Sequence, residues 1–218
     1  MNQQWADNLQ KLLTPSGKAW WLEDPMQNLY GRDKVVLKNW VVLKSEHNYR
    51  TPRNMLDEIN LFLDLKNPIE SLSPIKGNSI DVLFYKEQIE LIPKTIQALD
   101  MAIAMGYNEK NIAVLKYRGR ESSALTPYTQ IGKYKLHAPL QKYDTQGNAI
   151  YSDGEITIDS VHRFKGRAAP CIIFTEVNFE KLDENAIRRI FVGATRATLK
   201  LIIVMSKSSK EVLLETSN

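Results

Sequence analysis

A helix followed by a buried strand, near the end of the chain, constrains the fold more than any other feature. Residues 187–203 read IRRIFVGATRATLKLII. Four apolar residues recur at the spacing of a buried helical stripe, namely Ile187, Ile190, Phe191 and Ala194. Asp183 stands ahead of them as an N-cap. The apolar run 199–205 predicts a strand buried on both faces, as strands of parallel sheets are.

The opposite side of this predicted helix carries Arg189, Gly193 and Arg196. A glycine inside a helix costs about 1 kcal/mol relative to alanine, so we expect Gly193 to let another backbone or a ligand approach. An amphipathic helix with a solvated Arg196 is the alternative, and this stretch alone favours it.

Residues 156–173 add a second signal. A predicted strand at 156–160 is followed by VHRFKG at 161–166, and a second buried strand follows at 171–177. Basic residues and a glycine after a parallel strand are typical of the anion sites of open α/β sheets.

Apolar runs and helical stripes alternate along the rest of the chain, which predicts βαβ units. Strands are expected near 18–22, 40–43, 80–85 and 111–117, and helices over 5–13, 53–65 and 88–105. The expected fold class is α/β, doubly wound, with a mainly parallel sheet and helices on both faces. Residues 119–155 favour a solvated loop and a hairpin that turns at 144–148; single-strand stacking by their interleaved Lys and Tyr residues is the alternative.

Composition sets further bounds. Twenty-nine Lys and Arg against 25 Asp and Glu give a net charge of +4, which suits a polyanionic partner. Cys171 lies in an apolar strand, so we expect a buried, inert thiol. The histidines are scattered and predict no metal site. No apolar stretch approaches 18 residues and no signal peptide opens the sequence, so the expected location is cytoplasmic, without a membrane partner.

The motifs resemble those of one family. VHRFKG at 161–166 and FVGATRA at 191–197 resemble motifs V and VI of UvrD/Rep-type superfamily 1 helicases. EDPMQNLYG at 23–31 resembles motif III, NYRT at 48–51 resembles motif IV, and IAVLKYR at 112–118 resembles a further segment. The resemblance implies the second RecA-like motor domain of an ATP-dependent DNA helicase or translocase.

The resemblance also implies roles for single residues. Arg196 and Arg50 would face the γ-phosphate of ATP, Gln27 would sense it, and Tyr49 would stack on adenine. Lys165 and Gly166 would also contribute to nucleotide binding. Single-stranded DNA, or RNA, would meet His162, Arg163, Tyr30 and Arg118. Arg50 and Arg196 should point toward one cleft, and Arg196 should be poorly engaged within this domain.

The same resemblance implies a domain division. Residues 1–33 would be a remnant of the end of the first motor domain, and residues 34–218 the second domain without its large helical insertion. No GxxxxGK followed by Ser or Thr occurs, so ATP and Mg²⁺ would be held mainly by a P-loop domain elsewhere in the same protein. Trp20 and Trp21 should then be loosely packed.

Two features keep other interpretations open. Arg167 and Ala168 stand where the family has Leu-Glu, so a ribose contact is lost and nucleotide affinity is in doubt. Because the P-loop is missing, a non-enzymatic module that binds nucleic acid or protein is the alternative function.

Overall fold

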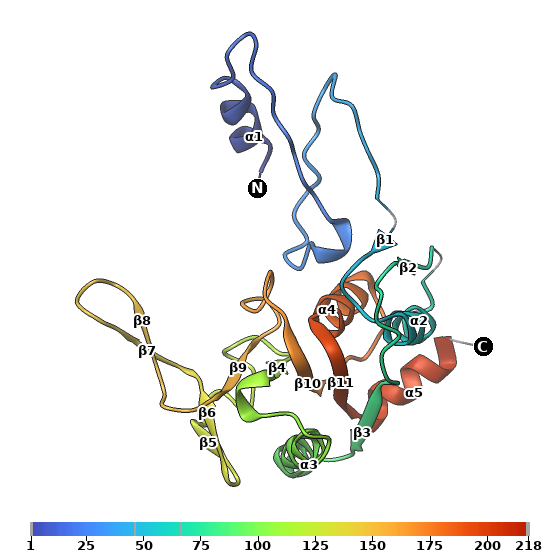
Figure 1. Ribbon diagram of the computed structural model, residues 1–218, viewed down its shortest axis with the longest axis vertical. Coiled ribbons are helices and arrows are strands. Elements are labelled where there is room, and N and C mark those ends of the chain that lie inside the picture. Colours follow the sequence, from blue (N-terminus) through green and yellow to red (C-terminus); the bar gives the residue numbers. More distant parts are fainter. Residues whose placement is uncertain (1, 46, 66, 217–218) are drawn as a thin grey trace.

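A seven-stranded sheet forms the centre of the molecule (Figure 1). The computed structural model describes residues 2–45, 47–65 and 67–216. The strand order is β3-β11-β10-β4-β9-β6-β5, and every neighbouring pair is parallel except β5 with β6. The strands are β3 (Asp81–Tyr85), β4 (Ile112–Lys116), β5 (Gln130–Ile131), β6 (Tyr134–His137), β9 (Ile156–Ser160), β10 (Ala169–Val177) and β11 (Ala197–Ser206).

Helices cover both faces of this sheet. Side chains alternate along a strand, so Cys171 and Ile173 of β10 join the core under one face while Ile172 and Phe174 join the core under the other. The first face carries α3 (Leu91–Ala104). The second carries α2 (Arg53–Phe62), α4 (Glu184–Ala194) and α5 (Lys207–Thr216). The predicted doubly wound, mainly parallel α/β fold is confirmed.

The helix α4 forms as its sequence predicts, but Gly193 has a different reason. Asp183 is the N-cap, and its carboxylate accepts a hydrogen bond from Ala186 N at 2.8 Å. A Cβ added at Gly193 would lie 2.4 Å from the Phe174 ring. The glycine therefore admits an aromatic side chain of β10 under the helix. The prediction that it admits a backbone or a ligand is wrong.

Residues 2–45 form an arm that extends away from the sheet (Figure 1). It holds α1 (Gln3–Gln10) and the 3-10 turn η1 (Pro25–Gln27). The strands predicted at 18–22 and 40–43 are absent from this described part of the chain. Val41 to Leu43 are at least three-quarters exposed, because no neighbouring strand lies beside them to complete a ladder. Apolar character alone does not make a strand.

The arm is loose at the tryptophans and anchored at η1. Trp20 is 80% exposed and Trp21 is half-buried, as expected for residues without a core in this domain. Met26 and Leu29, in contrast, pack against the core under α4. The prediction of loose packing thus holds for the tryptophans and is wrong for residues 25–29.

The connection between β4 and β9 contains no α-helix; all its residues are described. It carries β5, β6 and a hairpin of β7 (Pro139–Tyr143) and β8 (Ala149–Tyr151) that extends from the sheet (Figure 1). Asp144 closes the predicted turn by accepting hydrogen bonds from the backbone of Gln146 and Asn148. Tyr134 is buried and donates to Asp100 at 2.6 Å, so its ring is not free for stacking. The described residues also contain a short parallel pair of strands, β1 (His47–Asn48) and β2 (Glu70–Ser71). Two 3-10 turns, η2 (Gln88–Glu90) and η3 (Glu109–Asn111), precede α3 and β4.

Candidate functional site

Arg196 lies at the junction between α4 and β11, at the edge of the sheet where β11 begins. Its side chain is buried, and its Nε donates to Val192 O at 3.0 Å. The two terminal nitrogens donate to Arg167 O at 3.4 Å and to Thr195 Oγ1 at 3.3 Å. The expectation of a poorly engaged guanidinium is wrong, because Arg196 satisfies a carbonyl that the end of α4 leaves free.

No carboxylate forms an ion pair with Arg196 among the described residues. Burial lowers the pKa of Arg196 to about 10; the positive charge of Arg50 lowers it too, while Asp24 raises it. These electrostatic effects require Arg50 and Asp24 to lie near the buried guanidinium. Arg50 and Arg196, which are far apart in sequence, therefore lie close enough to interact electrostatically.

The loop that carries Arg50 is held by Asn48. The Asn48 Oδ1 accepts hydrogen bonds from Arg50 N and Thr51 N, both at 2.9 Å, in an Asx-type turn. This turn leaves Arg50 exposed and the ring of Tyr49 66% exposed. A ring in that position is available for stacking on a flat partner.

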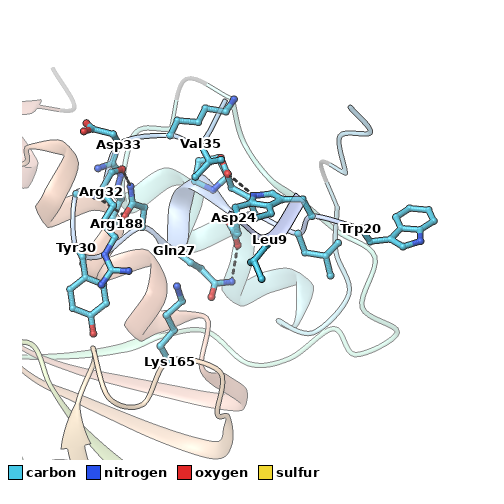
Figure 2. A pocket seen from close by; sticks show the side chains of 17 residues that line it. Leu9, Trp20, Asp24, Gln27, Tyr30, Arg32, Asp33, Val35, Lys165 and Arg188 are labelled. Carbon is cyan, nitrogen blue, oxygen red and sulfur yellow. Dashed lines mark hydrogen bonds between the residues drawn. The ribbon is translucent and has the colours of Figure 1, made fainter. Parts of the chain in front are cut away.

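An open cleft of about 930 Å³ lies between the arm and the 161–168 loop (Figure 2). We call it the Asp24 cleft; its polar lining includes Asp24, Gln27, Lys165 and Arg188. The Gln27 Nε2 donates to Asp24 Oδ2 at 2.7 Å, and Lys165 points toward Gln27 from the loop below. Gly166 has a φ of 87°, which allows the loop to turn directly after Lys165.

A second group of predicted residues lies around His162. Its ring centroid is 5.5 Å from that of Tyr30. The His162 Nδ1 is buried without a hydrogen-bond partner in the described part of the chain. Burial and the charge of Arg189 lower the pKa of His162, so the ring is neutral at neutral pH. Arg189 itself lies 4.9 Å over the Tyr117 ring.

Arg163 and Arg118 lie near the carboxyl ends of the strands. Arg163 Nε is 3.6 Å from Asp159 Oδ1, at the end of β9. Burial raises the pKa values of Tyr85 and Glu176, which stand at the ends of β3 and β10, and the nearby charge of Arg118 opposes this rise. The predicted residues thus fall into two groups, and Tyr30 belongs to both because it also lines the Asp24 cleft (Figure 2). The 161–168 loop links the two groups. It follows β9 and carries Arg163, and its Arg167 O accepts a hydrogen bond from Arg196.

Sequence reasoning missed several residues of these groups. Asp24 lies within the motif III-like segment, yet its charge on Arg196 could not be read from spacing. Arg188 lines the cleft and pairs with Glu184 at 2.7 Å, an i, i+4 spacing that the sequence does contain. Lys116 is buried at the end of an apolar strand, and nothing in the sequence marks it.

Comparison with known proteins supports the resemblance to UvrD-like helicases. Residues 155–204 match the family model of the UvrD-like helicase C-terminal domain. The matched segment contains β9, the 161–168 loop, β10, α4 and most of β11. The resemblance of this region to the C-terminal domain of UvrD-like helicases is confirmed.

One solved structure is similar over most of the fold. It is the C-terminal domain of a possible DNA helicase from Lactobacillus plantarum WCFS1, with a TM-score of 0.55 and 16% sequence identity. The similarity covers 74% of this chain and 89% of that chain. At this identity the likeness shows a shared fold. No curated protein matches the chain.

No helix among the described residues is long and apolar enough to cross a membrane. Within the same part of the chain, no group of three or more His, Cys, Asp or Glu side chains is placed to hold a metal ion. The thiol of Cys171 is buried, and burial raises its pKa to about 12, so it is unreactive as predicted.

Proposed function

We propose that this chain acts as the C-terminal motor domain of an ATP-dependent DNA helicase or translocase. The observation that carries the proposal is the electrostatic interaction of Arg196 with Arg50 and with Asp24 of the cleft, while neither arginine forms an ion pair among the described residues. Two arginines close enough to repel each other, neither of them paired with a carboxylate, suit an anion supplied by another body.

The residues of the cleft fit a nucleoside triphosphate. ATP would supply the phosphoryl group, and Mg²⁺ would be held by the P-loop domain of the same protein. Arg50 and Arg196 would lie against the phosphate charge, Gln27 and Lys165 would contact it from the cleft, and Tyr49 would stack on the base. Gly166 would let the loop approach. Ala168 offers no carboxylate to a ribose, which predicts weak discrimination of the sugar.

The second group would contact single-stranded DNA, or RNA. Tyr30 and His162 offer two tilted rings with centroids 5.5 Å apart, and Arg163 and Arg118 offer positive charge near the carboxyl ends of the strands. Arg196 donates to Arg167 O in the loop that leads to this group. A change at the buried Arg196 would therefore act directly on the loop that carries the residues proposed to bind nucleic acid.

The domain division is part of the same proposal. Residues 1–33 would belong to the edge of the first motor domain and residues 34–218 to the second. The exposed apolar side chains of the arm support this division, since Trp20 and Leu22 are 80% and 91% exposed. A cytoplasmic location fits a DNA motor.

The first test is the ATPase activity of the 218-residue chain, measured with and without single-stranded DNA. We expect negligible turnover and binding no tighter than roughly millimolar, because no phosphate-cradling loop is present in the sequence. Robust turnover by the purified chain would contradict the proposed nucleotide site.

The reading frame upstream of Met1 separates the motor from its alternative. A P-loop and an acidic Mg²⁺ motif there support the motor. Their absence supports a non-enzymatic binding module on the same fold, an alternative favoured by the lack of a P-loop in these 218 residues.

A further inference from the structure

A small polar pocket lies at the carboxyl ends of β4 and β9, away from the Asp24 cleft. We call it the basic pocket. Its volume, about 20 Å³, admits one group the size of a water oxygen. Three cationic side chains line it together with two hydroxyls and one carboxylate: Lys116, Arg120, Arg163, Thr126, Ser160 and Asp159.

Lys116 is the innermost cation of the pocket. It is 7% exposed, and its Nζ donates to Thr126 Oγ1 at 2.9 Å. The Thr126 hydroxyl in turn donates to Arg120 O at 2.7 Å, which fixes the loop that brings Arg120 over the pocket. An ammonium has three N–H groups. The hydrogen bonds of the described residues occupy one of them.

Charges of both signs surround Lys116. Burial lowers the pKa of Lys116, the charges of Glu176 and Asp159 raise it, and the charges of Arg120 and Arg163 lower it. Three cations thus lie near one another. Asp159 already accepts from Ser160 N at 2.9 Å and pairs with Arg163.

The second carboxyl near Lys116 lies outside the lining of the pocket. Glu176 is buried, accepts a hydrogen bond from Ala124 N at 2.8 Å, and has its pKa raised by burial. The pocket itself is lined by three cationic side chains and by one carboxylate, that of Asp159. An external anion at its mouth would therefore be attracted by all three cations.

We propose that the basic pocket binds one phosphate group, with a single oxygen entering toward Lys116 while Arg120 and Arg163 contact the oxygens that stay at the mouth. Planar guanidinium groups match such oxygens well. The ligand chemistry is a phosphodiester of a nucleic-acid strand or a free phosphate. We favour the strand, because Arg163 is adjacent in the chain to His162, and this choice rests on the proposed function.

Binding of fluorescein-labelled oligo(dT) to the 218-residue chain tests the site, followed by anisotropy over a salt series. Lys116→Met keeps the volume and removes the charge. We expect about tenfold weaker binding and a salt slope reduced by about one. Lys135→Met, an exposed residue of β6 outside the pocket, is the matched control and should change neither quantity beyond its small share of long-range charge.

Arg120→Gln is a second variant, at the mouth of the pocket, that keeps the test valid if the buried Lys116→Met fails to fold. Thermal melting of each protein in inorganic phosphate, against chloride at equal ionic strength, forms the other arm. Weaker oligo(dT) binding in the variants supports the phosphodiester.

If inorganic phosphate stabilises the wild type but not the variants, and oligo(dT) does not bind, the ligand is a free phosphate and not a nucleic-acid strand. Equal behaviour of the wild type and the folded variants in both arms overturns the site, whatever the ATPase test of the proposed function shows.

Discussion

Single residues in this fold serve more than one purpose, and Arg196 is the clearest case. Its guanidinium bonds Val192 O and Arg167 O, so it holds the end of α4 to the 161–168 loop while it lies beside Arg50. Removing it would leave the carbonyl of buried Val192 with only a 3.4 Å hydrogen bond from Thr195 Oγ1, at a cost of about 1–3 kcal/mol. A loss of activity in Arg196→Ala would therefore mix a structural and a functional cause.

Arg50 offers the cleaner test of the arginine pair. It is exposed, so Arg50→Ala should change the free energy of unfolding by no more than about 0.5 kcal/mol. In the protein encoded by the complete reading frame it should lower ATP turnover by roughly 10³-fold or more, as loss of an arginine finger does. Steady-state kinetics and thermal melting measure the two effects. Lys94→Ala, on α3 across the sheet, is the control; equal turnover in both variants would remove Arg50 from the site.

Glu176 predicts a pH dependence of stability. Its φ is 61°, and one carboxylate oxygen is buried without a hydrogen-bond partner among the described residues. Burial raises its pKa above the ordinary value of 4.5, despite the nearby charges of Lys116 and Arg118. The folded state thus holds this proton more tightly than the unfolded chain. Its stabilising contribution is present below pH 4.5 and is lost as the pH rises through the raised pKa.

Glu176→Gln should remove this term while it keeps the acceptor for Ala124 N. We expect the variant to gain stability relative to the wild type as the pH rises from about 4.5 toward neutrality. Urea unfolding at a series of pH values measures the difference. The exposed Glu180→Gln is the control, and a difference for Glu176→Gln that does not vary with pH would contradict the prediction.

At the scale of elements, α4 and β10 approach closely because Gly193 faces Phe174. A Cβ added at Gly193 would lie only 2.4 Å from the nearest carbon of the Phe174 ring. Gly193→Ala should therefore destabilise the fold by about 1–3 kcal/mol, although alanine favours the helix by about 1 kcal/mol. Denaturant unfolding measures the change.

Gly119 provides the matched control, since no atom lies within 4 Å of a Cβ placed there. Gly119→Ala should stay near the wild-type stability. Adding Phe174→Leu to Gly193→Ala should recover part of the loss, because the two side chains share one space. Equal costs for both alanine substitutions would show that the contact is not limiting.

At the scale of the whole molecule, the arm and the sheet differ in how they are stabilised. The sheet domain buries two layers of apolar side chains, whereas the arm leaves large side chains exposed from Trp5 to Leu43. The four tryptophans of the chain all lie in the arm. Their fluorescence therefore reports on the arm and not on the core.

Limited proteolysis should cut the arm first. We expect cleavage within 11–22 or 32–45 before any cut inside 81–206, because these arm segments have few buried contacts. Mass spectrometry of the fragments identifies the sites. The tryptophan emission should change little through the unfolding of the sheet domain, because no tryptophan lies in its core. Early cuts within the parallel strands would contradict this division of stability.

The sequence by itself determined the elements whose pattern is local. The α4 stripe, its Asp183 cap and the apolar runs of β3, β4, β9, β10 and β11 follow from side-chain periodicity, which a single segment already contains. They were enough to predict the parallel sheet and the class. The order of motifs also placed Arg50, Tyr49 and Arg196 among the candidates.

Only the tertiary structure decided what depends on neighbours. The apolar run 40–43 is not a strand, because a strand requires a partner for its backbone and none lies beside it. Gly193 meets a ring from β10, and Arg196 is buried because the 161–168 loop returns to its guanidinium. In the sequence Lys116 only ends an apolar strand, and its place in the basic pocket depends on the loop that carries Arg120. Contacts between distant segments, unlike periodicity, form only when the whole chain packs.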